Sequence, residues 1–251
     1  MRPAEDPLAT AAALAVQGEL EPPPAAQPRV ELKLPLANRT PAAVLGAIRR
    51  HPLGFERLHA TRWIHNVYFD TPSLCCFQTS VAGASQRLKL RLRWYGAAAG
   101  EGVGALEWKW RRGGAGAKWV VPVRWEGELA KQPWSVLRRG FRCELDGRQR
   151  ATFDALAIPT LLNRYRREYW ISRDGRVRLT LDDSLVFVPQ SGGLALQTRG
   201  ALPWHRVQVL EVKLPTGEAG TAREALRGFP YRPARFSKYT TGIELALVRR
   251  A

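Results

Sequence analysis

Cysteine, acidic residues and long apolar runs are all scarce in this sequence. Among 251 residues there are three cysteines, with Cys75 and Cys76 adjacent and Cys143 distant. That spacing fits neither a structural zinc site nor a disulfide framework, and it favours a reducing compartment. No run of about 18 apolar residues is present, so no transmembrane segment is predicted. The first residues also lack the basic flank of a secretory signal, and we expect a cytoplasmic protein.

The scarcity of acidic residues leaves a large excess of positive charge. Asp and Glu number 22 and Lys and Arg number 39, which gives a net charge of +17. Anions are therefore the expected partners: nucleic acid, acidic lipid headgroups or free phosphate compounds. Charge alone does not choose among them, and a peripheral contact with a membrane or a membrane protein stays open.

The composition divides the chain into two parts. Residues 1–28 are rich in Ala and Pro with few bulky apolar residues, so they are predicted to form a disordered tail. The hydrophobic content of 45% is enough for a sizeable core. Residues 29–251 are therefore interpreted as one domain.

Short strand patterns dominate this domain. A helix is predicted over 40–50, where Thr40 is the N-cap and Pro41 the first helical residue. Weaker helix patterns cover 131–139 and 218–227. The predicted strands are 30–36, 62–70, 86–95, 104–111, 118–125, 163–172, 176–187 and 206–214. Links such as Gly113-Gly114 and Asp174-Gly175 favour hairpins, so the expected sheet is antiparallel.

One strand carries the main functional signal. Cations alternate with apolar residues from Arg87 to Trp94, and because strand side chains alternate between faces, Arg87, Lys89, Arg91 and Arg93 point one way. An ordinary amphipathic strand with one wet face would show the same alternation. A single strand therefore does not decide between a functional and a structural interpretation.

The same polar stripe recurs in three further strands. Its members are Glu107, Lys109 and Arg111, then Arg176, Arg178, Thr180 and Asp182, then Glu211 and Lys213. Strands that close with their apolar faces outward under helices would bring these charges together inside. Two unit charges about 4 Å apart repel by roughly 4 kcal/mol at an effective dielectric near 20, so such an interior must hold water or a polyanion. The sequence predicts an α+β fold, a closed antiparallel eight-stranded β-tunnel with a basic interior and flanking helices. Arginine forks favour phosphate as the bound group.

An ordered set of motifs from about residue 29 to 246 resembles a known family. The motifs are Glu31-Leu32-Lys33, Tyr68-Phe69-Asp70-Thr71, Leu90 to Gly96, Leu106-Glu107-Trp108-Lys109, Tyr165-Arg166-Arg167, Val177 to Asp182, Leu210 to Leu214 and Phe236-Ser237-Lys238. The sequence is similar to the catalytic domain of the vacuolar transporter chaperone (VTC) family, the polyphosphate polymerases of the CYTH-like triphosphate tunnel metalloenzyme superfamily.

The resemblance implies a reaction and a set of site residues. The reaction is transfer of the γ-phosphate of ATP to a polyphosphate chain with release of ADP, and the implied cofactor is Mn²⁺ or Mg²⁺ with Glu211 as its ligand. Arg91, Arg93, Arg178 and Lys213 would hold the transferred phosphoryl group. The remaining implied phosphate ligands are Lys33, Lys109, Lys118, Arg167, Ser237 and Lys238.

Other reactions and partners remain open at this stage. Triphosphatases and cyclases of the superfamily have Glu-x-Glu-x-Lys near the N-terminus, whereas Arg29 replaces the first Glu here, which favours a polymerase. The alternatives are a triphosphatase or cyclase on the same fold, and a non-catalytic module that binds polyphosphate or RNA. Strict alternation without an exposed-aromatic motif argues against a specific nucleic acid partner.

Several further residues have a structural interpretation beside a functional one. Glu107, Asp182 and Glu244 are either additional metal ligands or partners of nearby arginines, and Asp70 is interpreted as a turn former. The histidines show no metal-ligand spacing. Trp94, Trp108 and Trp110 fall opposite the charged stripe and are expected to pack beneath helices.

Overall fold

The computed structural model describes residues 29–98, 100–112, 115–190, 193–204, 207–215 and 219–249; the expected tail at 1–28, the Gly113-Gly114 link and His205 lie outside this part. Each predicted strand is found. The elements are β1 (Arg29–Ala37), α2 (Pro41–Arg49), β2 (Glu56–Asp70), α3 (Cys75–Val81), β3 (Gln86–Tyr95), β4 (Glu101–Arg112), β5 (Ala115–Glu128), the 3₁₀ turn η1 (Leu129–Lys131), α4 (Trp134–Cys143), α5 (Gly147–Ala155), β6 (Ile158–Ile171), β7 (Arg178–Pro189), β8 (Leu202–Trp204), β9 (Val207–Pro215), α6 (Ala219–Arg227) and α7 (Lys238–Val248).

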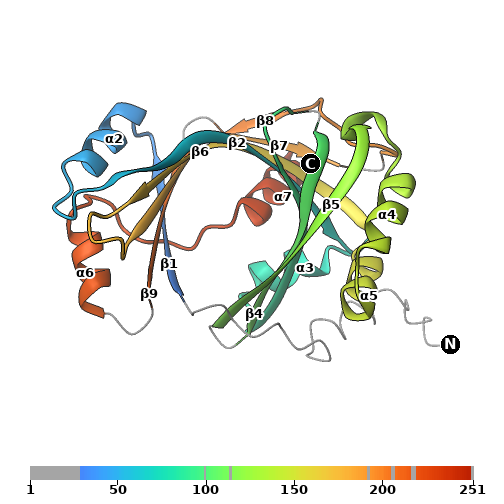
Figure 1. The fold of residues 1–251 in the computed structure, drawn as a ribbon, viewed down its shortest axis with the longest axis horizontal. Coiled ribbons are helices and arrows are strands. Elements are labelled where there is room, and N and C mark those ends of the chain that lie inside the picture. Colours follow the sequence, from blue (N-terminus) through green and yellow to red (C-terminus); the bar gives the residue numbers. More distant parts are fainter. Residues whose placement is uncertain are drawn as a thin grey trace.

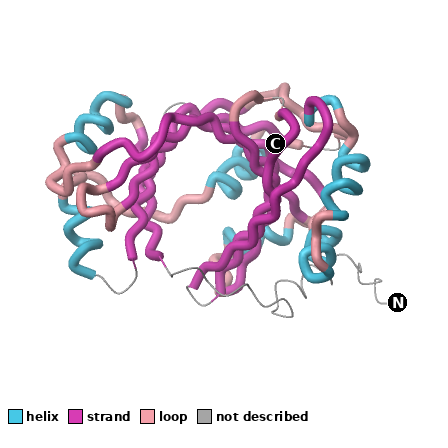
Figure 2. The backbone as a smooth tube through the Cα atoms, in the orientation of Figure 1, coloured by secondary structure: helices cyan, strands magenta, loops and turns pink. Residues whose placement is uncertain are grey.

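The strands form one antiparallel sheet that bends into an arch (Figures 1 and 2). Its order is β1-β9-β7-β6-β2-β3-β4-β5, with β8 beside β7 as a ninth strand. The expected closed eight-stranded tunnel is therefore only partly confirmed. Within the described residues no pairing joins β1 to β5, so the sheet is open at these two strands.

The outer edge of β1 carries another segment of the chain. The backbone N–H of Ala234 donates to the carbonyl of Lys33, so the segment leading into α7 contacts this edge. A side-chain ion pair spans the opening: Lys109 Nζ on β4 lies 3.0 Å from Glu31 Oε2 on β1. We call the opening between β1 and β5, together with this ion pair, the seam.

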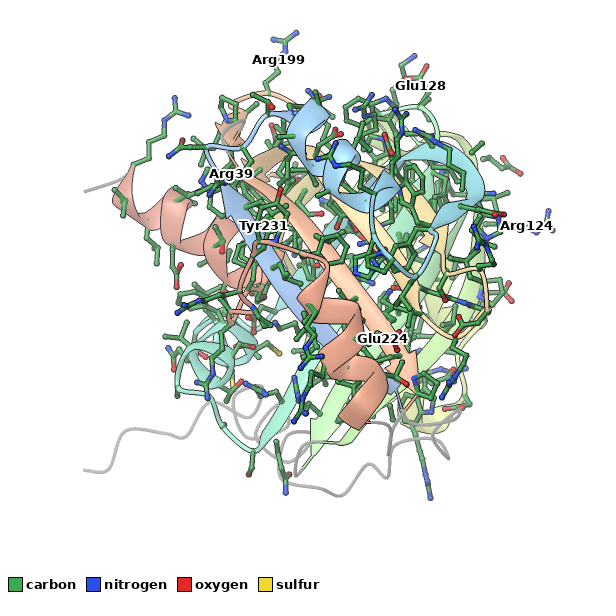
Figure 3. All side chains as sticks on the ribbon, turned by 90° about the vertical axis from the view of Figure 1, so that its left-hand side faces the viewer. Arg39, Arg124, Glu128, Arg199, Glu224 and Tyr231 are labelled. Atoms are coloured by element: carbon green, nitrogen blue, oxygen red, sulfur yellow. The ribbon has the colours of Figure 1, made fainter. Side chains whose placement is uncertain are left out.

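Apolar side chains gather on the convex side of the arch. One core packs α2 and α6 against β1, β9 and β7, with Val44, Ile48 and Ala225 contributed by the helices. The other core includes Trp134 and Phe141 of α4. Figure 3 views the first side, where α2 and α6 face the viewer and the Arg39 guanidinium carbon lies 6.0 Å from the centroid of the Tyr231 ring. As expected, Trp94, Trp108 and Trp110 are buried in the second core.

The concave side is polar except at one end, where α7 covers it (Figure 1). Tyr239 of α7 stacks on Tyr68 of β2 with ring centroids 4.8 Å apart. Gly242 lets the helix approach closely: a Cβ built there would lie 2.4 Å from Leu161 Cδ2 and 2.6 Å from Phe187 Cδ1. The helix therefore closes this end of the arch.

Asp70 fixes the junction between β2 and α3. Its fully buried carboxylate accepts hydrogen bonds from the backbone N–H groups of Thr71, Cys76 and Phe77 and from the Tyr239 hydroxyl at 2.5 Å. The side chain thus caps α3 and ties α7 to it. This confirms its structural interpretation and extends it beyond a turn.

Some sequence expectations differ from the structure. Helices α3, α5 and α7 and strand β8 were not predicted, and the helix expected at 131–139 begins at Trp134. Arg176 was placed in the charged stripe, but β7 begins at Arg178. The Asp174 carboxylate accepts the backbone N–H of Arg176, which holds that residue in the turn before the strand.

Candidate functional site

Charged side chains from most strands of the arch converge on its concave face. Strand alternation turns these residues inward while their apolar neighbours pack outward beneath the helices. The cations of this concave face are Lys33, Lys89, Arg91, Arg93, Lys109, Lys118, Arg167, Arg178, Lys213 and Lys238, and its carboxylates are Glu31, Glu107, Asp182 and Glu211. Cations outnumber carboxylates, as a polyanion site requires.

Glu107 on β4 organises the first group of cations. Arg91 Nε and NH2 lie 2.7 and 2.6 Å from Glu107 Oε2, Lys118 Nζ lies 2.5 Å from Oε1, and Arg93 NH1 lies 3.5 Å from Oε2. Burial favours protonation of Glu107, but the three cations hold its pKa at about 2. Glu107 therefore remains a carboxylate that positions three cations.

Asp182 on β7 and Glu211 on β9 organise the second group. Arg167 grips Asp182 through two bonds of 2.5 and 2.7 Å, and Lys238 Nζ lies 2.5 Å from Asp182 Oδ2. Around Glu211, the nearest nitrogen atoms of Arg167, Lys213, Lys238 and Lys33 lie at 3.5, 3.7, 3.8 and 4.0 Å. Two carboxylates thus face four cations.

In this second group the carboxylates and the cations stabilise each other's charged forms. Burial disfavours the carboxylates, yet Arg167 and Lys238 lower the pKa of Asp182, and Lys238 and Arg167 hold that of Glu211 well below its usual range. Burial also disfavours the charged form of Lys238, but Asp182 and Glu211 raise its pKa. A buried charge of this kind is tolerated only while its partners stay in place.

Tyr165 on β6 lies between the two groups. Its hydroxyl accepts a hydrogen bond of 3.4 Å from Arg93 NH2 of the first group. The same ring lies 4.7 Å from Lys238 Nζ and 5.3 Å from the Arg167 guanidinium carbon of the second. The two groups therefore form one continuous polar surface.

Lys89 and Arg178 differ from the other cations. Within the described residues, neither side chain forms an ion pair with a carboxylate. Lys89 Nζ donates instead to Ser237 Oγ at 2.8 Å, beside the start of α7. Burial lowers the pKa of Lys89 to about 8. Arg178 is exposed and pairs in register with Lys213 across β7 and β9.

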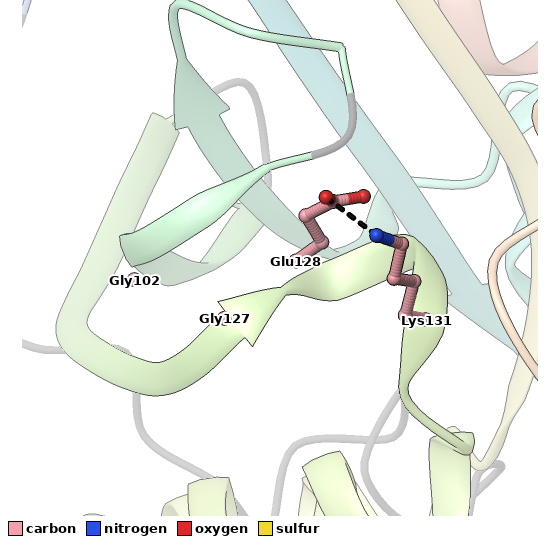
Figure 4. Close-up of a pocket in the computed structure, with 4 residues that line it drawn as sticks. All are labelled: Gly102, Gly127, Glu128 and Lys131. Atoms are coloured by element: carbon pink, nitrogen blue, oxygen red, sulfur yellow. Dashed lines mark hydrogen bonds and ion pairs between the residues drawn. The ribbon is translucent and has the colours of Figure 1, made fainter.

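A small cavity of about 200 Å³ opens beside Arg178 and Lys213 and also involves Arg167. A second, more open hollow of about 560 Å³ lies at the start of β4 and the end of β5 (Figure 4). Gly102, Gly127, Glu128 and Lys131 line it, and its Glu128 and Lys131 pair with each other at 2.8 Å. Because the second hollow includes none of the concave-face cations, the first is the one connected to the site.

Comparison with known proteins gives the family. The sequence model of the VTC domain matches residues 27–247. The chain belongs to the VTC domain family. It is thereby placed among polyphosphate-related tunnel enzymes.

Two solved structures match this VTC domain at low identity and low TM-score. A crystal structure of a candidate adenylate cyclase from Vibrio parahaemolyticus has a TM-score of 0.46 and 16% identity, covering 87% of this chain and 98% of that one. The Mediator head module of Schizosaccharomyces pombe has a TM-score of 0.35 and 10% identity, with coverage of 89% and 93%. No curated protein matches the chain.

The VTC domain brings the expected phosphate ligands together on the concave face. Of the three uncertain carboxylates, Glu107 and Asp182 pair with cations, whereas Glu244 is exposed on α7. Lys89 and Tyr165 were not assigned to the site from sequence, although Lys89 lies in the charged stripe and Tyr165 in one of the family motifs. The sequence pattern does not show which residues lie close in space, and only the fold places Lys89 beside Ser237 and Tyr165 beside Arg93.

The family implies a divalent metal, and the carboxylates here fit one mode of binding it. Across the described residues no three His, Cys, Asp or Glu side chains form a metal-binding group. Glu31 lies close enough to Glu211 to be affected by its charge. Mg²⁺ is commonly held by one or two carboxylates together with substrate phosphates. Glu211 and Glu31 therefore suit a metal shared with phosphate oxygens and do not suit a metal held by protein alone.

The remaining expectations concern thiols, histidines and membranes. All three cysteines are free thiols. His51 packs against Phe55 and Phe229, and His65 stacks on Trp94, so both are structural. No helix in the described ranges has the length and apolarity needed to cross a membrane.

Proposed function

We propose that this VTC domain is a polyphosphate polymerase that transfers the γ-phosphate of ATP to a polyphosphate chain and releases ADP. The observation that carries the proposal is the pair of linked cation groups around Glu107 and around Asp182 and Glu211. Each group holds more cations than carboxylates. A chain of phosphates bound along the concave face would neutralise the excess positive charge.

The geometry supplies what phosphoryl transfer needs from a protein. Alignment of the reacting groups and neutralisation of charge carry most of the catalysis. Arg91 and Arg93 are held by Glu107 with their guanidinium groups on the concave face, while Arg178 and Lys213 approach from the opposite strands. These four would hold the transferred phosphoryl group. The attacking phosphate oxygen is already ionised near neutral pH, so no general base is required.

The other expected ligands would bind the rest of the phosphate chain. Lys118 belongs to the Glu107 group, and Lys33, Arg167 and Lys238 belong to the Glu211 group. Lys109 stands at the seam, and Ser237 caps α7. A divalent metal bound with the triphosphate would neutralise further charge, and Glu211 with Glu31 would hold it.

The test is an assay with ATP and Mn²⁺, with and without a short polyphosphate primer, following ADP, free phosphate and chain length. Arg93→Met and Glu211→Gln should each abolish chain growth. Lys131→Met is the matched control, because Lys131 is an exposed surface cation paired with Glu128 and should leave the rate unchanged.

The products separate the alternatives. Chain growth with ADP and little free phosphate supports the polymerase. Free phosphate without polymer would replace it with a triphosphatase, and conversion of ATP without either product would point to a cyclase. Tight binding of polyphosphate without turnover would leave a binding module, and competition by RNA that weakens steeply with salt would extend that module to nucleic acid.

A further inference from the structure

One end of the concave face carries accessible aromatic rings next to phosphate-binding cations. The cavity of about 200 Å³ is lined by Leu58, His59 and Tyr169, which we call its ring side, together with the cations Arg167, Arg178 and Lys213. The proposed polymerase function accounts for the cations. It leaves the ring side of the cavity without a role.

The ring side is shaped by irregular pairing of β2. The register between β2 and β6 shifts between Arg57 and His59 and again between His59 and Arg62. Such bulges redirect a side chain and are frequent beside active sites. Here they set the exposed His59 ring edge-on to Tyr169, with centroids 5.5 Å apart and an interplanar angle of 73°.

A second pair of groups extends this aromatic side. Tyr95 at the end of β3 is 51% exposed, and the Arg62 guanidinium carbon lies 6.0 Å from its ring centroid. Burial raises the pKa of Tyr169, so its ring remains a neutral phenol. Neutral rings flanked by arginine form the kind of surface on which nucleobases stack.

The size of the cavity limits what can enter it. Pockets for whole small-molecule ligands are commonly about 300–1,000 Å³, so a cavity of about 200 Å³ suits one flat fragment with the rest of the ligand outside. The side next to Arg178 and Lys213 leads onto the phosphate-binding surface. At the other end of that surface the Tyr68 and Tyr239 rings stack on each other beneath α7, and both are buried.

From this arrangement we infer that the cavity beside His59 and Tyr169 is a nucleobase subsite that fixes the direction of the bound nucleoside triphosphate. The base lies at this end, and the γ-phosphoryl group lies between Arg178 and Lys213 on one side and Arg91 and Arg93 on the other. The inference rests on the proposed function and adds the binding of the base and the orientation of the substrate to it.

The test compares a ligand that has a base with one that lacks it. Binding of ATP and of inorganic tripolyphosphate is measured by calorimetry for the wild type, His59→Ala, Tyr169→Leu and the double variant. Stacking on an aromatic side chain is worth about 1–3 kcal/mol per base, so the double variant should bind ATP about tenfold more weakly. Its affinity for tripolyphosphate should change less than twofold, which also shows that the concave face is intact.

Tyr231→Ala is the matched control, because Tyr231 lies beside Arg39 (Figure 3) and does not line the cavity. Its ATP affinity should equal that of the wild type. Equal losses for ATP and tripolyphosphate in the double variant, or an unchanged ATP affinity, would overturn the subsite and leave the phosphate site standing. A wild-type protein that binds neither ligand would overturn the subsite together with the proposed function.

Discussion

Lys89 is the residue whose environment departs furthest from that of its neighbours in β3. Arg91 and Arg93 share Glu107, whereas Lys89 donates to the Ser237 hydroxyl at 2.8 Å and has no carboxylate partner among the described residues. Lys33 and Lys109 also lie close enough to lower its pKa, in addition to the effect of burial. The positive end of the α7 dipole lies nearby as well, because Ser237 caps that helix. An ammonium so placed is stabilised by an arriving anion.

We predict that Lys89 makes phosphate binding depend on pH around pH 8. Its pKa of about 8 means that the side chain is charged below that pH and loses its charge above it. Tripolyphosphate should therefore bind more weakly as pH rises from 7 to 9. Lys89→Arg should bind with little change over this range, and Lys89→Met should be about tenfold weaker at pH 7 than the wild type.

Tyr68 provides the necessary control for this titration. Burial opposes its ionisation, but Arg91 lowers its pKa to about 8, so a phenolate would add negative charge in the same pH range. Tyr68→Phe removes that contribution and should retain most of the pH dependence. A Lys89→Arg variant whose affinity falls with pH as steeply as the wild type would contradict the prediction.

At the scale of elements, the alternation of side chains was sufficient to predict the strands and their faces. The run from Arg87 to Trp94 divides in the structure as it does in the sequence, with Leu88, Leu90, Leu92 and Trp94 buried. Helix α7 could not be predicted in this way. Thr240, Thr241 and Gly242 have low helix propensity, and the helix is stabilised by packing against β6 and β7.

Helix α7 gives a prediction that depends on this packing. Gly242→Ala adds a Cβ that would meet Leu161 and Phe187, so it should lower the free energy of unfolding by about 1–3 kcal/mol and weaken tripolyphosphate binding by shifting Ser237 and Lys238. Gly220→Ala in α6 is the control, since nothing lies within 4 Å of the added atom. That change should be neutral or stabilise by about 0.5–1 kcal/mol. Urea denaturation measures both, and equal effects in the two helices would refute the packing argument.

For the molecule as a whole, the sequence predicted which charges share a face and left their pairing undetermined. Arg166 and Arg167 are adjacent in sequence, yet Arg166 pairs with Asp183 and Arg167 with Asp182 on opposite faces of the sheet. The opening of the sheet between β1 and β5 was also beyond the sequence pattern. At the outer edge of β1 the hydrogen-bond partner of Lys33 is Ala234, a residue far away in the chain.

The paired carboxylates make global stability sensitive to acid. Glu107 has a pKa of about 2 in the folded chain against a usual 4.5, and the pKa values of Asp182 and Glu211 are also lowered. Because these pKa values are depressed on folding, the stabilisation is present above about pH 4.5 and is lost as pH falls toward 2. Melting temperatures measured from pH 6 to pH 2 should decline through this window.

Glu107→Gln is the variant that checks the assignment. It removes the titrating group, so its melting temperature should be lower than that of the wild type at pH 6 and should fall less between pH 4.5 and pH 2. Asp154→Asn is the matched control, because Asp154 pairs with Arg142 at the exposed surface and contributes little. A Glu107→Gln curve parallel to the wild-type curve would show that the acid sensitivity arises elsewhere.

Under the proposed polymerase function, the seam between β1 and β5 bears on how a long product would leave. In a sheet closed by backbone hydrogen bonds, a polymer could depart only by sliding lengthwise through the ring. Here the ion pair between Lys109 of β4 and Glu31 of β1 spans the opening, and no strand pairing joins β1 to β5 in the described chain. An exposed ion pair is weak and exchanges readily with water. Under the proposed polymerase function, a growing chain would therefore have a sideways exit between β1 and the β4–β5 pair, where no strand pairing has to break.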